Sequence, residues 1–303
     1  MNKLARSLLY FGLGSLAAGT VCGIGFTVNF GRRMRSWERE RLRRLGQSKS
    51  LTLESIEGIL VRHGDRPRPT IVFVHGRSAN PMEVFPIAEA MIREGFNVVL
   101  WQHRGRAISY GQRVIDEILG IVEEVRADPF VDESQVFLLG LSLGGAVAIG
   151  AAAQDHNRHI AAIVADSSYA NLKRAAFRYV TAFGWMPSII VWPTSFVTFR
   201  VAELVHNIAF ETSNPSDWAS HVKCPVLLIH GAKDRKIPSD HALEIESRLS
   251  SEKQLWLVDN VGHVAAFAKR PHEYVKRITD FIGRSQTAPT EKRRQNYDGQ
   301  DRL

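Results

Sequence analysis

Short apolar segments alternate with amphipathic segments along most of this chain, and this alternation constrains the fold more than any other feature. Strand-like runs occur at residues 70–74, 96–101, 135–139, 160–165, 226–230 and 254–258, after one or two strands at 51–61, and helix-like segments occur at 82–93, 112–126, 143–154, 241–249 and 272–282. Continuous apolar strands separated by helices are typical of a parallel sheet that is covered on both faces. The sequence therefore predicts an α/β fold with a mostly parallel central sheet and helices on both faces.

One long interval interrupts this alternation. Residues 170–222 contain helical stretches rich in large apolar side chains, including Trp185, Trp192 and Phe196. An interval this long and this apolar is not typical of a loop. We expect a helical cap insertion over the carboxyl edge of the sheet, and a contribution to the core alone is the alternative.

The first 31 residues have the properties of a membrane anchor. No charged residue occurs from Ser7 to Gly31, and 25 residues at helical rise can cross a hydrocarbon core of about 30 Å. A cleaved signal peptide is the alternative, but the apolar sequence continues to Phe30, well past the small residues near Ala17. The more basic side of a span tends to stay in the cytoplasm. We therefore expect a single-pass membrane protein whose folded domain is cytoplasmic.

The formal net charge of +8 lies almost entirely outside the predicted domain. Residues 1–31 carry +2, residues 32–49 carry +6 and residues 284–303 carry +2, which leaves residues 50–283 at −2. A nucleic-acid groove needs basic residues on the folded surface, whereas a basic cluster beside a membrane span attracts anionic lipid head groups. We expect a basic juxtamembrane linker at 32–49, a folded domain at 50–283, a disordered tail at 284–303 and no nucleic-acid partner.

The sequence offers little for redox or metal chemistry. Its two cysteines, Cys22 and Cys224, are a poor disulfide pair and too few for a metal site, so we expect free, buried thiols. No pair of histidines has metal-ligand spacing beside a carboxylate. We expect neither a metal nor a cofactor.

The segment Gly140-Leu141-Ser142-Leu143-Gly144 carries the strongest chemical signal. It follows the apolar run 136–139 and precedes the helix-like residues 145–149. A Gly-x-Ser-x-Gly motif between a strand and a helix is typical of a nucleophile elbow, because the sharp turn at the serine tolerates only small neighbours. The motif predicts Ser142 as a nucleophile.

A serine hydroxyl needs a base to take its proton, and the base needs a carboxylate that orients it. In chains with this elbow the order is serine, acid, histidine. Asp234 follows the predicted strand at 226–230, and His263 follows the strand at 254–258. We predict Asp234 as the acid and His263 as the general base. Asp166, at the end of the strand at 160–165, is the alternative acid, although capping of the next turn through Ser167 and Ser168 is the favoured role for it.

Two backbone amides are candidates for an oxyanion hole, which would stabilise a tetrahedral intermediate. The amide of Leu143 follows the nucleophile at the amino end of a helix, where the helix dipole adds to its effect. The second amide should come from the turn after the strand at 70–74, in His75-Gly76-Arg77-Ser78. We predict Arg77 as that donor.

These features resemble the α/β-hydrolase superfamily from about residue 56 to residue 282, and specifically its membrane-anchored, Bem46-like or prolyl-oligopeptidase-like serine hydrolases. The resemblance rests on residues 74–76, 102–105, 166–168, 215–218 and 225–231, together with the elbow at Ser142, with Asp234 and with Gly262-His263. Similar sequences usually have aspartate where this chain has Gln102, which affects the details of the substrate pocket. The resemblance implies the α/β-hydrolase fold and a Ser-His-Asp triad.

The predicted function is that of an acyl hydrolase, like a carboxylesterase or a thioesterase, that forms an acyl-enzyme on Ser142. The anchor and the apolar interval at 170–222 favour a small acyl substrate that is derived from lipid. Two alternatives stay open. One is a serine peptidase for small peptides, and the other is a membrane-tethered binding protein that keeps the fold without activity.

Overall fold

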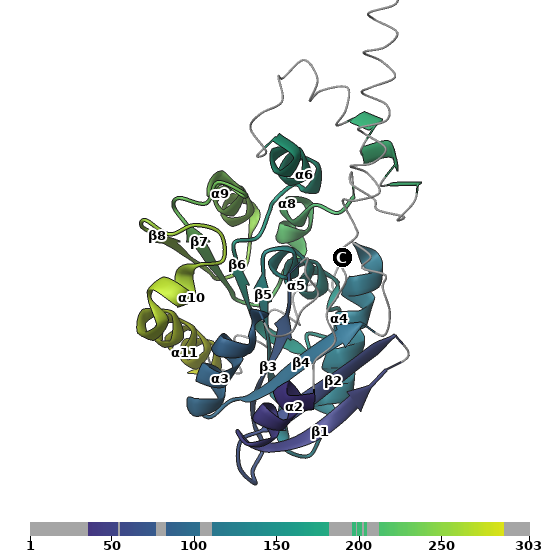
Figure 1. The fold of residues 1–303 in the computed structure, drawn as a ribbon, viewed down its shortest axis with the longest axis vertical. Coiled ribbons are helices and arrows are strands. Elements are labelled where there is room, and N and C mark those ends of the chain that lie inside the picture. Colours follow the sequence, from purple (N-terminus) through teal and green to yellow (C-terminus); the bar gives the residue numbers. More distant parts are fainter. Residues whose placement is uncertain are drawn as a thin grey trace, which may run out of the picture.

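The central element of the protein is a twisted β-sheet. The computed structural model describes residues 36–53, 55–76, 83–103, 111–181, 196–197, 199–201, 203–204 and 212–287. Within them one eight-stranded sheet has the order β1-β2-β4-β3-β5-β6-β7-β8. Its strands are β1 (Gln47–Thr52), β2 (Ile56–Arg62), β3 (Arg68–Val74), β4 (Asn97–His103), β5 (Val131–Leu141), β6 (Ile160–Asp166), β7 (Val226–Gly231) and β8 (Lys253–Val258). Figure 1 shows helices on both sides of this sheet.

The sheet is parallel over most of its width. Neighbouring strands from β4 through β3 to β8 are parallel, whereas β1 pairs with β2, and β2 with β4, in antiparallel register. The carboxyl ends of parallel strands lie at one edge of a sheet, where open α/β folds build their binding sites. The residues that follow β3, β5, β6, β7 and β8 therefore meet at this edge.

Successive side chains of each strand point to opposite faces of the sheet, and a hydrophobic cluster lies on each face. Ile71 and Phe73 of β3 belong to one cluster, and Val72 and Val74 belong to the other. The first face is covered by α2 (Ser36–Arg43), α3 (Phe85–Arg93), α10 (Ala266–Lys269) and α11 (Pro271–Thr287). The second is covered by α4 (Gln112–Arg126), α5 (Leu143–Gln154) and α9 (Asp240–Arg248). Because both faces are buried, central strands such as β4 and β7 are mostly apolar.

The predicted α/β class and its mostly parallel sheet are confirmed, but two predicted boundaries are wrong. Strand β1 begins at Gln47, inside the predicted linker 32–49, because it pairs with β2 along its length and buries Leu51. Its polar sequence is typical of an edge strand and conceals it from a hydrophobicity pattern. Helix α11 ends at Thr287, inside the predicted tail 284–303, and Ser285 in its last turns is buried.

Several predicted segments lie outside the described residues. The predicted anchor at residues 1–31 is one of them, and in the part of the chain that the structure does describe, no helix is both long and apolar enough to cross a membrane. Residues 182–195 and 205–211 of the predicted cap also lie outside. The described ends of that insertion are α6 (Leu172–Thr181) after β6, and α8 (Pro215–Trp218) with the 3-10 helix η2 (Ala219–His221) before β7.

Candidate active site

Ser142 occupies a strained turn between β5 and α5. Its φ is 55° and its ψ is −117°. A positive φ is uncommon for a residue with a side chain and persists only where surrounding contacts hold it. The Ser142 amide donates to the Asp166 carbonyl at 2.8 Å, and the Ser142 carbonyl accepts from the Gly145 amide at 3.0 Å. These bonds hold the serine side chain at the carboxyl edge of the sheet.

The glycines on either side of this serine are required by the close approach of backbone segments. A Cβ atom on Gly140 would lie 2.2 Å from the Gly144 carbonyl oxygen, and one on Gly144 would lie 1.9 Å from the Val74 carbonyl oxygen. Both separations are far below any van der Waals contact. The Gly-x-Ser-x-Gly spacing therefore serves the geometry of this strand, turn and helix.

The His263 imidazole lies between Ser142 and Asp234. Its Nε2 is 2.9 Å from Ser142 Oγ, and its Nδ1 is 2.7 Å from Asp234 Oδ2. A carboxylate oxygen only accepts, so Nδ1 carries the proton and Nε2 presents its lone pair to the serine hydroxyl. The structure thus brings together the three side chains that the sequence singled out, in the geometry of nucleophile, base and orienting acid.

Asp234 is buried, and both of its carboxylate oxygens accept hydrogen bonds. Its Oδ1 accepts the backbone amides of Lys236 and Ile237, each at 2.9 Å, while Oδ2 faces His263. His230 Nε2 lies 3.6 Å from Oδ2 and donates to the Ile237 carbonyl at 2.8 Å. Burial lowers the pKa of His230, which favours the neutral form of this second ring. These contacts hold the carboxylate as an acceptor in one orientation.

Asp166, the alternative acid, has other partners. Its Oδ1 accepts the Ser167 hydroxyl at 2.9 Å, and its Oδ2 accepts the Tyr274 hydroxyl at 3.1 Å. Burial raises the pKa of Asp166 to about 6. The predicted contact with Ser167 is present, whereas the hydroxyl of Ser168 donates to the Tyr169 carbonyl instead. The geometry therefore favours Asp234 over Asp166 as the partner of His263.

Tyr274 is the residue near the site that sequence reasoning missed. It lies in α11, 108 residues from Asp166, and its ring is completely buried. An aromatic residue on the apolar face of a predicted helix normally indicates a core residue. No local signal identifies the buried carboxylate that its hydroxyl meets.

The two predicted oxyanion donors differ in what the structure describes. The Leu143 amide lies at the start of α5, where the first N–H groups of a helix have no partner within it. Arg77 lies outside the described residues. The preceding Gly76 is close to the nucleophile, because a Cβ built on it would lie 3.6 Å from Ser142 Cβ. Gly76, the last described residue of this turn, therefore lies beside the serine.

His75 and His103 form an aromatic cluster with Trp101 at the same edge of the sheet. The rings of His75 and Trp101 have centroids 4.3 Å apart, and those of Trp101 and His103 are 5.1 Å apart. Burial lowers the pKa of both histidines to about 4; the neighbouring His103 adds to the effect at His75, and the charge of Arg113 adds to it at His103. Both are neutral near pH 7 and pack as aromatic rings.

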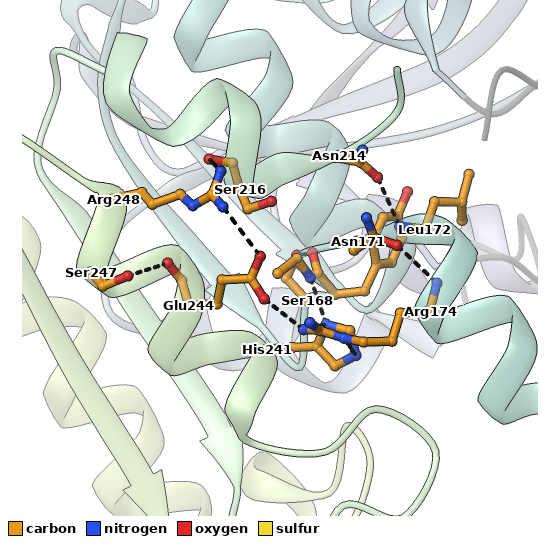
Figure 2. Close-up of polar contacts among 12 residues, drawn as sticks. Ser168, Asn171, Leu172, Arg174, Asn214, Ser216, His241, Glu244, Ser247 and Arg248 are labelled. Atoms are coloured by element: carbon orange, nitrogen blue, oxygen red, sulfur yellow. Dashed lines mark hydrogen bonds and ion pairs between the residues drawn. The ribbon is translucent and has the colours of Figure 1, made fainter. Parts of the chain in front are cut away.

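The two ends of the cap interval are joined by hydrogen bonds and anchored on α9. Figure 2 shows Asn214 beside Leu172 and the ring of His241 beside Arg174. The Leu172 amide donates to Asn214 Oδ1 at 3.1 Å, and the Ala170 amide donates to His241 Nδ1 at 3.0 Å. Arg174 also donates to Glu244 at 2.7 Å. The two ends of the insertion are therefore held to each other and to α9.

The described residues contain no group of three or more histidine, cysteine or acidic side chains placed to hold a metal ion. Cys224, the cysteine among them, is not in a disulfide, and burial raises the pKa of its thiol to about 12.

A strained serine elbow before a helix, with an acid after β7 and a histidine after β8, defines a serine-hydrolase-like α/β-hydrolase fold. More specifically, the chain belongs to the prolyl oligopeptidase family, whose sequence profile matches residues 99–287, more than half of its length.

Relatives of this chain exist in bacteria and yeast. YfhR of Escherichia coli is 25% identical over 223 residues, which cover 72% of this chain and 71% of YfhR. The bem46 protein of Schizosaccharomyces pombe is 23% identical over 192 residues, covering 61% of this chain and 58% of bem46.

Solved structures share the fold at low sequence identity. An esterase from Pyrococcus furiosus superposes with a TM-score of 0.70 at 20% identity, over 85% of this chain and 98% of the esterase. An acylaminoacyl peptidase from Pyrococcus horikoshii superposes with a TM-score of 0.58 at 21% identity, over 78% of this chain and 40% of the peptidase. Both esterases and peptidases are therefore built on this fold.

Proposed function

We propose that this protein is a serine hydrolase that cleaves an ester or thioester through an acyl-enzyme on Ser142. The observation that carries the proposal is the continuous contact from Ser142 Oγ through His263 to the buried Asp234. A hydroxyl, an imidazole and a carboxylate in this order make up the apparatus that activates a serine for attack on a carbonyl.

The reaction would proceed in two halves. His263 Nε2 takes the proton of Ser142 as the hydroxyl oxygen bonds to the substrate carbonyl carbon, and it then gives that proton to the leaving alcohol or thiol. In the second half His263 takes a proton from water as the water oxygen bonds to the acyl carbon. It then gives that proton to Ser142 Oγ as the bond between Oγ and the acyl carbon breaks and the carboxylic acid leaves. Asp234 holds the Nδ1–H tautomer and stabilises the imidazolium that forms in each half.

The oxyanion of each tetrahedral intermediate requires two donors at the carboxyl edge of the sheet. We assign the amide of Leu143 to one position and the amide of Arg77 to the other. The closeness of Gly76 to the Ser142 side chain supports the second assignment. Loss of one such donor costs on the order of 100- to 1000-fold in rate in enzymes of this chemistry.

The higher TM-score of the esterase, 0.70 against 0.58 for the acylaminoacyl peptidase, favours an acyl substrate over a peptide. The esterase from Pyrococcus furiosus is covered almost completely by this chain, whereas only 40% of the acylaminoacyl peptidase is covered. The apolar interval at residues 170–222 and the predicted anchor at 1–31 favour acyl chains derived from lipid. Hydrolysis of small peptides is the second candidate, because the family includes peptidases by name.

Labelling with a fluorophosphonate probe tests the proposal at its first step. The wild-type chain should become labelled, and Ser142→Ala should not. Ser285→Ala, which removes a buried hydroxyl from α11, is the matched control and should label like wild type. A folded wild-type chain that resists the probe would leave the non-catalytic binding protein as the better account.

Substrate choice is tested with p-nitrophenyl esters of increasing acyl length and with aminoacyl p-nitroanilides. We expect the ester to be preferred and kcat/KM to rise with acyl length. A preference for the anilides would establish the peptidase alternative, and equal turnover of all acyl lengths would contradict a lipid-derived substrate.

We also propose that residues 7–31 anchor the protein in a membrane with the hydrolase domain in the cytoplasm. The charge difference across this segment supports that orientation, with +2 before it and +6 after it. Protease added to spheroplasts should leave the domain intact. Digestion of the domain without lysis would reverse the orientation.

A further inference from the structure

The end of β6 contacts the backbone around all three members of the proposed triad. The Asp166 carbonyl accepts the Ser142 amide at 2.8 Å, and the Ser167 amide donates at 2.8 Å to Ile229 of β7, the strand that leads to Asp234. The Ser167 hydroxyl oxygen accepts the amide of Val264 at 3.1 Å, and Val264 directly follows His263. Asp166 and Ser167 therefore contact the turn at Ser142, the strand β7 before Asp234, and the loop that carries His263, here called the histidine loop.

The direction of each hydrogen bond in this group is determined by its chemistry. The Val264 amide can only donate, so the Ser167 oxygen must accept from it. The same hydroxyl then has its proton available for Asp166 Oδ1, 2.9 Å away. Asp166 therefore orients the hydroxyl that holds the residue next to His263.

Tyr274 completes the surroundings of this carboxylate. Its hydroxyl donates to Asp166 Oδ2 at 3.1 Å, and both side chains are buried. With one hydroxyl on each oxygen, the Asp166 carboxylate has a single orientation. The burial of a carboxyl group is unfavourable, so its presence here calls for a role that an apolar side chain would not fill.

The histidine loop needs such a restraint. Val264 has a φ of 52°, which is an outlier for a β-branched residue, and Ser167 itself has a φ of 56°. A conformation of this kind persists only where neighbouring groups hold it. The bond from the Val264 amide to Ser167 is one such contact, and it lies one residue from the imidazole.

We propose that Asp166 and Ser167 are positioning residues for His263, acting through the Val264 amide to keep the imidazole within reach of Ser142. This inference rests on the proposed hydrolase function for its kinetic consequence, but not for its structural one. Asp166 also lies close enough for its pKa to respond to the charges of His263 and Asp234, after burial and its two hydroxyl partners.

The test compares Ser167→Ala with Ser285→Ala in the full chain. Both changes remove a buried serine hydroxyl, but the Ser285 hydroxyl donates to the Phe281 carbonyl inside α11. We expect Ser167→Ala to lower the rate of fluorophosphonate labelling about 10- to 100-fold, because a small misplacement of a base has an effect of this size. The KM for an ester should change much less than kcat. Ser285→Ala should retain the wild-type rate.

A spectroscopic measurement keeps this test independent of activity. The proton between His263 Nδ1 and Asp234 should give a low-field proton resonance, assigned by its absence in Asp234→Asn. Ser167→Ala and Asp166→Asn should broaden or abolish this resonance, whereas Ser285→Ala should retain it. If the wild-type chain does not label at all, the proposed function fails, and the resonance still decides whether these residues position the histidine.

Tyr274→Phe provides a milder variant in case Ser167→Ala does not fold. It removes one hydroxyl from Asp166 and leaves the ring packed in the core, so we expect a smaller fall in labelling rate and a broader resonance. Wild-type labelling and a wild-type resonance in Ser167→Ala, or in Tyr274→Phe where the first variant is unfolded, would overturn the proposal.

Discussion

Asp234 Oδ2 lies 2.7 Å from His263 Nδ1, although the two residues are 29 positions apart in the chain. The second oxygen of Asp234 accepts two backbone amides, so the carboxylate cannot rotate away from the imidazole. The tautomer of His263 is therefore determined by a carboxylate whose own orientation is determined by the backbone.

The first prediction concerns this pair. Asp234→Asn should slow fluorophosphonate labelling roughly ten-thousand-fold, because an amide that donates to Nδ1 would stabilise the wrong tautomer. Asp128→Asn is the control, since Asp128 is a buried aspartate that bonds to Lys49 and Arg62 before the amino end of β5. It should lower stability and leave the labelling rate of folded protein unchanged. Similar rates for the two variants would argue against Asp234 as the acid.

The second prediction concerns the space around the elbow. Gly144→Ala would place a Cβ atom 1.9 Å from the Val74 carbonyl oxygen, so the backbone must shift. We expect a loss of about 3 kcal/mol or more in the free energy of unfolding, together with loss of labelling. Gly120→Ala in α4 meets nothing within 4 Å and should stabilise the chain by up to about 1 kcal/mol. Urea titration of both variants measures the difference, and a Gly144→Ala variant as stable as Gly120→Ala would contradict the described turn.

The third prediction concerns the pH dependence that Asp166 introduces. Burial raises the pKa of Asp166 from 3.8 to about 6, so between these values the folded chain binds more protons than the unfolded chain. Its contribution to the free energy of unfolding therefore falls as the pH rises from about 4 to 6, by about 3 kcal/mol in total. The Asp166→Asn side chain does not titrate in this range. The free energy of unfolding of wild type should therefore fall relative to that of this variant as the pH rises from 4 to 7. A constant difference between the two across this range would show that the carboxyl group titrates normally.

The fourth prediction concerns His241 at the base of the cap interval. Burial, with help from the Arg174 charge, lowers the pKa of His241 from 6.5 to about 4. Here the unfolded chain binds more protons, so the contribution of His241 is complete above about pH 6.5 and is lost as the pH falls toward 4. The loss should reach roughly 3 kcal/mol.

In His241→Asn, the amide oxygen can still accept the Ala170 amide, but the side chain does not titrate. Thermal unfolding at pH 7 and pH 4.5 should show a smaller acid-induced decrease for this variant than for wild type. An equal decrease in both proteins would show that the acid sensitivity arises elsewhere.

Much of the fold was predictable because it follows from local patterns. The apolar runs at β3 and β5 are continuous because both faces of these strands are buried, and the intervening amphipathic segments are helical. Strand β1 was not predictable in the same way. Its sequence Gln47–Thr52 is mostly polar, and it becomes a strand because β2 offers an unpaired edge.

In the candidate site, too, some residues were predictable from local sequence and others were not. Ser142 was identifiable because the steric need for Gly140 and Gly144 is local and leaves a recognisable spacing. The choice between Asp166 and Asp234 was not local, because both follow apolar strands of the sheet. It depends on which carboxylate faces His263 and on a tyrosine 108 residues from Asp166.

The sequence by itself determined the α/β class, the elbow at Ser142 and the alternation of strands and helices from β3 to α5, because hydrophobic periodicity and tight turns depend on near neighbours in the chain. Only the tertiary structure decided that Asp234 rather than Asp166 meets His263, and that Ser167 and Tyr274 surround Asp166. Those contacts depend on the packing of β6, β7 and α11, since hydrogen bonds between distant segments form only after the sheet has aligned their ends.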